Sequence, residues 1–121
     1  MNSIGVTERL VIRMNWLSGY WELEEKIITL EGKLKQLELD SIGDSSIQVL
    51  ANFLIDKKEE KKELIKLVST FKHLDNKILK LKYIDKMTLE SIANQLGFSD
   101  SYIYKKHAVL MKVMKSKNEV K

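Results

Sequence analysis

The chain of 121 residues contains no cysteine and no proline, and it has only five glycines and two histidines. The absence of cysteine excludes a disulfide framework and is typical of proteins that work in a reducing cytosol. Two histidines without cysteine make no zinc-binding pattern, so we expect neither a metal nor a cofactor. The absence of proline removes the residue that most strongly interrupts helices, and long helices are therefore expected.

Long apolar runs and enzyme motifs are missing as well. Hydrophobic residues make up 44% of the chain and charged residues 31%, a balance typical of a folded, helix-rich protein. The apolar runs are far shorter than the roughly 20 residues that a membrane-spanning helix needs, and the first residues do not follow the pattern of a secretory leader. No glycine-rich phosphate loop and no nucleophile–base pair is present. We therefore expect a soluble, cytoplasmic protein that is not an enzyme and has no membrane partner.

The most informative stretch runs from Leu81 to Met114 and contains two short helical patterns separated by a turn at Gly97. Thr88 and Ser99 are placed to cap the two helix starts, and Gly97 suits the left-handed residue at a helix end. Ala93 provides the small side chain that two steeply crossing helices need. This order of cap, small residue, glycine and cap favours a helix-turn-helix over an ordinary helical hairpin. The expected inward-facing residues are Leu89, Ile92, Ala93, Leu96, Ile103, Leu110 and Met114.

The second of these helices is expected to present its first turns to DNA, because helix-turn-helix proteins read base edges in this way. Asp100 suits a cytosine amino group, but a carboxylate at this place also complements the helix dipole. Ser101 can bond either class of base, and Lys105 can reach guanine or a phosphate. The tyrosines and Lys106 suit contacts to the DNA backbone, although the tyrosines can also pack within the protein. The expected DNA-binding residues are Thr88, Ser99, Asp100, Ser101, Tyr102, Tyr104, Lys105 and Lys106.

Positive charge is concentrated in the same part of the chain. Residues 71–121 hold eleven lysines and five acidic residues, whereas residues 1–40 carry a net charge of −2 and residues 41–70 are neutral. Such an excess favours polyanion binding by counterion release, although a basic tail can also simply be solvated. His107 falls on the inward side of its helix, where we expect a packed, hydrogen-bonded imidazole rather than a phosphate contact.

The N-terminal part predicts a helical arm. From Trp16 onward, apolar residues recur at alternating spacings of four and three, the heptad pattern of a coiled coil. A break is expected across residues 40–44, after which Ser45 and Gln48 form a capping-box pattern for a second helix. That helix carries a charged run at 56–63, which we interpret as a solvated helical stretch rather than a disordered linker. The seam consists of Trp16, Tyr20, Leu23, Ile27, Leu30, Leu34 and Leu37.

The apolar faces of the two arm helices must be covered, either by each other within one chain or by a second chain. We favour self-association through the seam, because dimers that read two DNA half-sites gain both affinity and specificity. A third helix is expected from about Asp75 to Tyr83, leading into the helix-turn-helix. The expected fold is therefore all-α, with a helical hairpin or coiled-coil arm at 1–70, a tri-helical helix-turn-helix unit at 71–116 and a basic tail at 117–121.

The stretch from Leu74 to Met114 resembles the fourth region of bacterial sigma factors, the part that recognises the upstream promoter element. There a charged helix ending in leucine-arginine-tyrosine precedes a threonine-capped helix and a glycine turn, and this chain shows LKLKYIDKMTLESIANQLGFSDSYIYKK in the same order. The chain departs from the pattern in having no proline after Leu74. No counterpart of the sigma region that melts promoter DNA is present, so we do not expect a complete sigma factor.

The layout of the whole chain is similar to that of phage late-gene transcription regulators of the RinA and ArpU kind. Those proteins combine an N-terminal helical arm with a sigma-like unit, and Tyr104-Lys105-Lys106-His107 resembles the tyrosine-arginine-x-histidine of their recognition helix. The resemblance implies an activator of phage late packaging and structural genes that binds double-stranded DNA in the bacterial host cell. The alternative is a protein-interaction module that binds host RNA polymerase or another regulator without specific DNA recognition.

Overall fold

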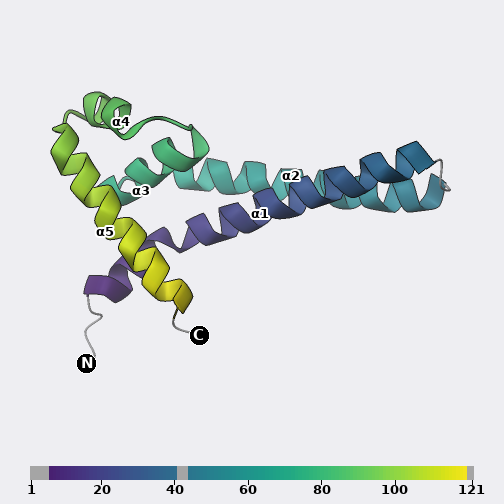
Figure 1. Cartoon of the computed structure of the whole chain (residues 1–121), viewed down its shortest axis with the longest axis horizontal. Helices are drawn as coiled ribbons and strands as arrows, with labels where there is room; N and C mark the ends of the chain where they lie inside the picture. Colours follow the sequence, from purple (N-terminus) through teal and green to yellow (C-terminus); the bar gives the residue numbers. More distant parts are fainter. Residues whose placement is uncertain (1–5, 41–43, 120–121) are drawn as a thin grey trace. The chain divides into compact units, whose positions relative to one another are not determined.

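The structure is a computed structural model that describes residues 6–40 and 44–119, with side chains for residues 14–40 and 45–115. The described residues form an all-α fold, as predicted (Figure 1). The centre of the predicted break, Ser41-Ile42-Gly43, and the last two residues of the predicted tail, Val120 and Lys121, lie outside the described residues. The elements are α1 (Val6–Asp40), α2 (Asp44–Ser69), α3 (Leu74–Leu79), the π-helical segment η1 (Lys80–Ile84), α4 (Leu89–Leu96) and α5 (Asp100–Glu119). None of these helices is both long and apolar enough to cross a membrane.

The chain divides into two compact units. The hairpin unit is Ser18–Leu67, and the core unit combines the described residues up to Leu17 with those from Val68 onward. The division at Val68 lies close to the predicted boundary at residue 70. The first turns of α1, which we expected in the arm, fall in the core unit, and both Met14 and Leu17 are completely buried. A helical hydrophobic pattern predicts that one face of a helix is buried, but it does not identify the element that buries it.

The hairpin unit consists of antiparallel segments of α1 and α2 (Figure 1). Ion pairs join the helices, with Glu24 3.6 Å from Lys61 and Glu31 3.8 Å from Lys58. The Lys61 ammonium also lies 5.5 Å from the centre of the Tyr20 ring. The charged run at 56–63 is helical, as predicted. However, α2 begins at Asp44, so Ser45 lies inside the helix, and the predicted capping box is wrong.

The predicted seam is covered within a single chain. Tyr20 and Ile27 are buried, and the remaining seam residues of the hairpin unit, Leu23, Leu30, Leu34 and Leu37, are half-buried. Within this chain α1 and α2 therefore close on each other, and self-association through the seam stays a prediction. Trp16, the first residue of the seam, belongs to the core unit instead.

The core unit is built around a small apolar cluster. Ile78 of α3, Ile92 and Ala93 of α4 and Ile103 of α5 are each 0% exposed. The partly buried residues packed against them are Leu74, Leu81, Met87, Leu89 and Leu96. The predicted inward stripes are thus confirmed, including the small Ala93 among the bulkier residues of the cluster.

The helix that precedes α4 differs in part from the prediction. It begins at Leu74, where the His73 imidazole accepts a hydrogen bond from the Asp75 amide. After Leu79 it continues as η1, whose closing hydrogen bond runs from the Asp85 amide to the Lys80 carbonyl (3.1 Å). The Lys80 ammonium pairs with the Asp85 carboxylate at 2.9 Å across the same segment. A π-helical turn of this kind is rare and is found mostly as a single turn within longer helices.

Candidate nucleic-acid interface

The start of α4 is fixed by Thr88, as predicted. Its hydroxyl oxygen accepts a hydrogen bond from the Ser91 amide at 3.1 Å, which satisfies one of the amides that a helix start leaves unpaired. The same hydroxyl lies 2.9 Å from the Ser91 hydroxyl, to which it donates. Thr88 is exposed, so its cap role leaves the side chain at the surface.

The turn between α4 and α5 also follows the prediction. Gly97 has a left-handed backbone with φ of 79° and donates its amide to the Ala93 carbonyl. The Ser99 hydroxyl then accepts from the Tyr102 amide at 3.2 Å and caps the start of α5. Because both helix ends are fixed by local hydrogen bonds, the direction in which α5 leaves the turn is determined by a short stretch of sequence.

The first turns of α5 present a polar surface. Ile103 is completely buried in the apolar cluster and anchors the helix, while the residues around it are exposed. Tyr104 is 45% exposed, and Tyr102 is 40% exposed with its ring stacked on Phe98 at a centroid distance of 4.9 Å. The exposed residues from the predicted set on this surface are Ser99, Asp100, Ser101, Tyr102, Tyr104 and Lys105, which we call the α5 surface.

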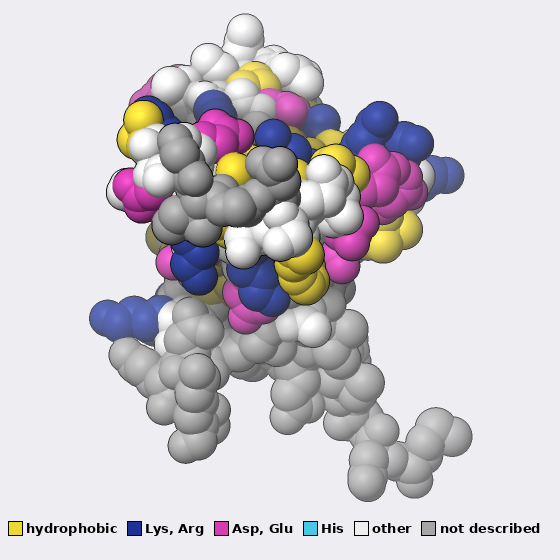
Figure 2. Space-filling view, turned by 90° about the vertical axis from the view of Figure 1, so that its right-hand side faces the viewer, with side chains coloured by type: hydrophobic (Ala, Val, Ile, Leu, Met, Phe, Trp, Pro, Cys, Tyr) yellow, Lys and Arg dark blue, Asp and Glu magenta, His cyan; other side chains and the backbone are white. Residues whose placement is uncertain are grey.

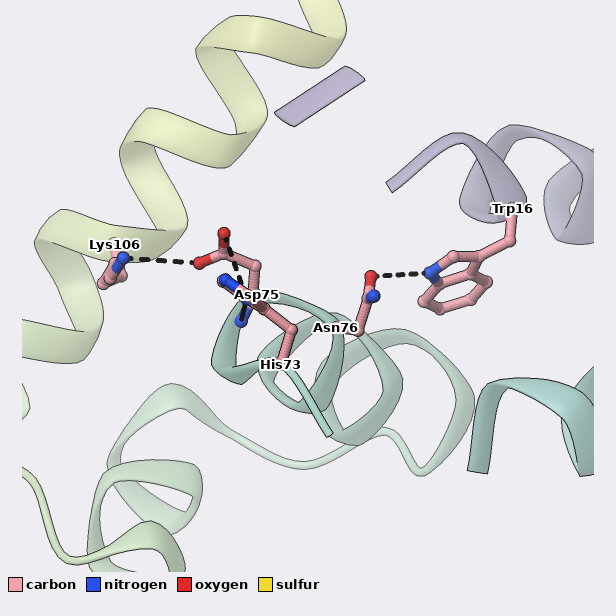
Figure 3. Close-up of polar contacts among 5 residues, drawn as sticks. All are labelled: Trp16, His73, Asp75, Asn76 and Lys106. Atoms are coloured by element: carbon pink, nitrogen blue, oxygen red, sulfur yellow. Dashed lines mark hydrogen bonds and ion pairs between the residues drawn. The ribbon is translucent and has the colours of Figure 1, made fainter. Parts of the chain in front are cut away.

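Lys106, which with Thr88 completes the predicted DNA contacts, forms an ion pair within the core unit. Its ammonium lies 3.4 Å from the Asp75 carboxylate, whose side chain is only 2% exposed (Figure 3). Asp75 is at the first turn of α3, so this ion pair joins α5 to α3. An ammonium held by a buried carboxylate has a structural role, and Lys106 is therefore not included in the α5 surface.

The residue after Asp75 makes a second connection from α3. The Trp16 indole Nε1 donates to the Asn76 amide oxygen at 2.9 Å, which joins the beginning of α1 to α3 (Figure 3). Asp75 and Asn76 are 1% and 6% exposed, and the sequence reading did not identify them. Asp75 precedes buried Ile78 and Leu79 by three and four residues, a helical spacing that places it on their face. This spacing is the signal that could have shown a buried carboxylate.

His107 is packed and hydrogen-bonded, as predicted. Its Nε2 lies 2.8 Å from the Tyr83 hydroxyl, and the two rings stack with centroids 5.9 Å apart. The Met111 sulfur lies 3.2 Å from the same hydroxyl. Burial, reinforced by the Lys82 charge, lowers the pKa of His107, and burial raises the pKa of Tyr83. The contacts of Tyr83 with His107 and Met111 join η1 to α5, and the lowered pKa of His107 favours its neutral imidazole.

The described part of the chain contains no cluster of three or more potential metal ligands. No curated protein and no solved structure matches the chain. One family model matches residues 46–115, which cover most of α2, all of α3, η1 and α4, and most of α5, and it is described as "Protein of unknown function (DUF1492)". Because this match spans more than half of the sequence, the chain belongs to the DUF1492 family.

Proposed function

We propose that the chain is a sequence-specific, non-enzymatic DNA-binding regulator of transcription. The observation that carries this proposal is the α5 surface: the capped start of α5 leaves six polar or aromatic side chains exposed while Ile103 anchors the helix from behind. Side chains in the first turns of the second helix are the ones that reach base edges in the major groove of helix-turn-helix complexes. Ser101 and Lys105 supply base-directed groups, and Tyr104 supplies a backbone contact.

The charge of the core unit supports a polyanionic partner. Lys105 is exposed, as are Lys72, Lys77, Lys86, Lys112 and Lys115, and none of them has an ion-pair partner among the residues that the structure describes. Lys80 and Lys106, in contrast, are neutralised by Asp85 and Asp75. Unpaired ammonium groups are those that release counterions when a nucleic acid binds, so binding should weaken steeply with salt.

The resemblance to phage late-gene regulators of the RinA and ArpU kind refines the proposal. On that basis the protein activates late packaging and structural genes, acts in the cytoplasm of a bacterial host and binds upstream of a promoter. Its DNA is double-stranded, and host RNA polymerase is a further candidate partner. This part rests on the likeness of residues 74–114 and of the layout, not on the geometry of the core unit.

A second candidate is a protein-interaction module that binds RNA polymerase or another regulator. It is favoured by a groove of about 270 Å³ in the core unit, whose lining residues include Phe71, Leu81 and Leu96 with Lys77 and Lys80. Apolar lining residues together with Lys77, which has no ion-pair partner among the described residues, suit an amphipathic, acidic protein segment.

The test is selection of binding sites from randomised duplex DNA, followed by fluorescence anisotropy on the selected and scrambled duplexes across a salt series. The regulator proposal expects tighter binding to the selected duplex at every salt concentration, and a steep loss as salt rises. Equal binding to both duplexes would contradict sequence-specific recognition. Absence of binding even at low salt would favour the interaction module.

A further inference from the structure

The hairpin unit exposes more large hydrophobic side chains than it buries. Among its described residues Tyr20, Ile27 and Leu54 are buried, whereas six large hydrophobic residues are exposed. The described residues of the core unit show the reverse, with nine large hydrophobic residues buried and four exposed. Helices in proteins are stabilised mainly by packing an apolar face. Because this pair of helices buries so few large side chains, we expect another surface to bury the exposed ones. The six exposed residues are Ile28, Leu39, Val49, Phe53, Ile55 and Leu67.

Part of this apolar surface forms a groove along α1 and α2. The groove has a volume of about 850 Å³, and its lining includes Ile28 of α1 and Phe53 of α2, which are 68% and 53% exposed. Val49, 54% exposed, lies one turn before Phe53 and lines two smaller hollows beside it. The apolar surface is therefore continuous along one side of α2 and reaches α1.

The charges that line this groove select its occupant. Two are acidic, Glu22 and Glu25, and two are basic, Lys26 and Lys57, of which Lys57 also pairs with Glu60 on the same helix at 3.2 Å. In a two-fold symmetric contact a surface meets a copy of itself, so a surface of one sign repels its copy and a surface of both signs can pair with it. In Figure 2 hydrophobic, basic and acidic side chains are interspersed on the coloured part of the face shown, with no single sign prevailing.

A different hollow on α2 carries charges of one sign only. It is lined by Asp56, Glu59, Glu60 and Glu63, all of them acidic. Glu60 and Glu63 pair with Lys57 and Lys66, but Asp56 and Glu59 keep the hollow acidic, so two copies of it would repel each other. The balanced groove charges also give a polyanion such as DNA no net attraction, unlike the lysines of the core unit.

We propose that a second copy of the chain docks on the groove face, which we define as Ile28, Val49 and Phe53 with Glu22, Glu25, Lys26 and Lys57. Two hairpins joined in this way place four helices around a shared apolar centre, the arrangement of a four-helix bundle. The part of α2 in the hairpin unit is about 36 Å long at 1.5 Å per residue. The groove face itself spans only residues 49–57 of α2, about 13 Å, so it forms the centre of the contact. A contact that continues along the whole hairpin, two helices each about 10 Å across, covers about 700 Å² per copy, close to the about 800 Å² per partner of a standard stable interface.

This surface differs from the seam that the sequence suggested for self-association. The seam from Tyr20 to Leu37 is buried or half-buried within the chain and lines the groove only at Leu30, whereas the groove face consists of exposed residues and the half-buried Lys57. The inference goes beyond the proposed DNA binding and does not depend on it. It concerns the hairpin unit alone, and the measured quantity is the molecular mass of the protein in solution.

The first experiment is sedimentation equilibrium of the full chain at micromolar concentrations. The wild type is expected at twice the chain mass of 14.1 kDa. Phe53→Glu should sediment as a monomer, because it places a carboxylate in the centre of the apolar contact. Ile55→Glu is the matched control, since Ile55 is 63% exposed on the same helix and does not line the groove. Both variants should keep wild-type helicity by circular dichroism because both positions are exposed.

The second experiment tests that the partner is the same face of another copy. One variant carries Glu22→Lys with Glu25→Lys, and the other carries Lys26→Glu with Lys57→Glu. Each alone should be monomeric because like charges then meet across the contact, and the equimolar mixture should regain the dimer mass. A monomeric wild type, a dimeric Phe53→Glu, or a mixture that stays monomeric would each overturn the proposal. DNA binding is measured separately, so its failure would leave this result unaffected.

Discussion

The Lys106 ammonium lies 3.4 Å from the Asp75 carboxylate, while Lys105, its neighbour in the chain, is exposed and has no ion-pair partner among the described residues. Successive residues of a helix point in directions about 100° apart, so two adjacent lysines can face different surroundings. Lys106 joins α5 to α3, and Lys105 is available to a ligand. Variants of these two lysines can therefore be compared directly, because Lys106 forms a structural ion pair and Lys105 is proposed to contact DNA.

Lys106→Met should lower stability without changing the electrostatics of DNA binding. Methionine keeps much of the aliphatic stem but leaves the buried Asp75 carboxylate without this ammonium. We expect the free energy of unfolding in urea to fall by about 1–3 kcal/mol. The slope of log affinity for DNA against log salt should remain that of the wild type, because no phosphate contact is lost. Wild-type stability together with a shallower slope would show that Lys106 binds phosphate instead.

Lys105→Met is expected to behave in the opposite way. Its unfolding free energy should stay within about 0.5 kcal/mol of the wild type, because the side chain is exposed. If Lys105 reads a base, binding to the selected DNA weakens by about 1–3 kcal/mol and specificity is relaxed at one position; if it contacts a phosphate, binding weakens on all sequences and the salt slope falls by about 1. Anisotropy on selected and scrambled duplexes distinguishes the two. Unchanged binding to both would remove Lys105 from the interface.

Gly97→Ala should destabilise the core unit by about 1 kcal/mol, because alanine adopts the left-handed φ of 79° at a cost. A Cβ at this position would meet no atom within 4 Å, so the cost is conformational rather than steric. Gly32→Ala is the control, since it lies within α1 and is also free of neighbours. It should stabilise by about 0.5–1 kcal/mol through helix propensity. Thermal unfolding of the two variants should shift in opposite directions.

The stability of the protein should decrease as the pH falls below 6.5, the ordinary pKa of histidine. Burial and the Lys82 charge lower the pKa of His107 in the folded state. Between the folded and unfolded pKa values the unfolded chain binds more protons, so acid favours unfolding there, and the loss is complete below the folded pKa. His107→Gln should remove this part of the pH dependence. Urea denaturation just above and below pH 6.5 checks it, and an equal decrease in the variant would assign the effect to other groups.

The features that the sequence predicted correctly are those that depend on neighbouring residues. The caps at Thr88 and Ser99 and the left-handed Gly97 each arise from hydrogen bonds or backbone preferences within a few residues. The apolar stripe through Ile92 and Ala93 follows from helical periodicity alone. These local signals were sufficient to place the α5 surface, although they do not test what binds there.

The features that the sequence did not predict depend on residues far apart in the chain. Asp75 and Asn76 are polar residues in a short helix, and their burial follows from partners 31 and 60 positions away. The π-helical segment from Lys80 to Ile84 was likewise not predicted. Its turn is wider than that of an α-helix, so it departs from the spacing of 3.6 residues per turn on which the prediction relied. The heptad seam was recognised, but the same pattern suits a partner helix in the same chain or in another chain.

Trp16→Phe tests the contact that Trp16 makes within its own chain against a contact with a second chain. Phenylalanine keeps an aromatic ring but cannot donate to the Asn76 amide oxygen, which is then left buried with one hydrogen bond fewer. We expect the free energy of unfolding to fall by about 1–2 kcal/mol while the sedimentation mass stays that of the wild type. A changed mass would show that Trp16 also takes part in a contact between copies of the chain. Adding Asn76→Leu to Trp16→Phe should recover part of the loss, because the amide that lost its donor is then replaced by an apolar group of similar size.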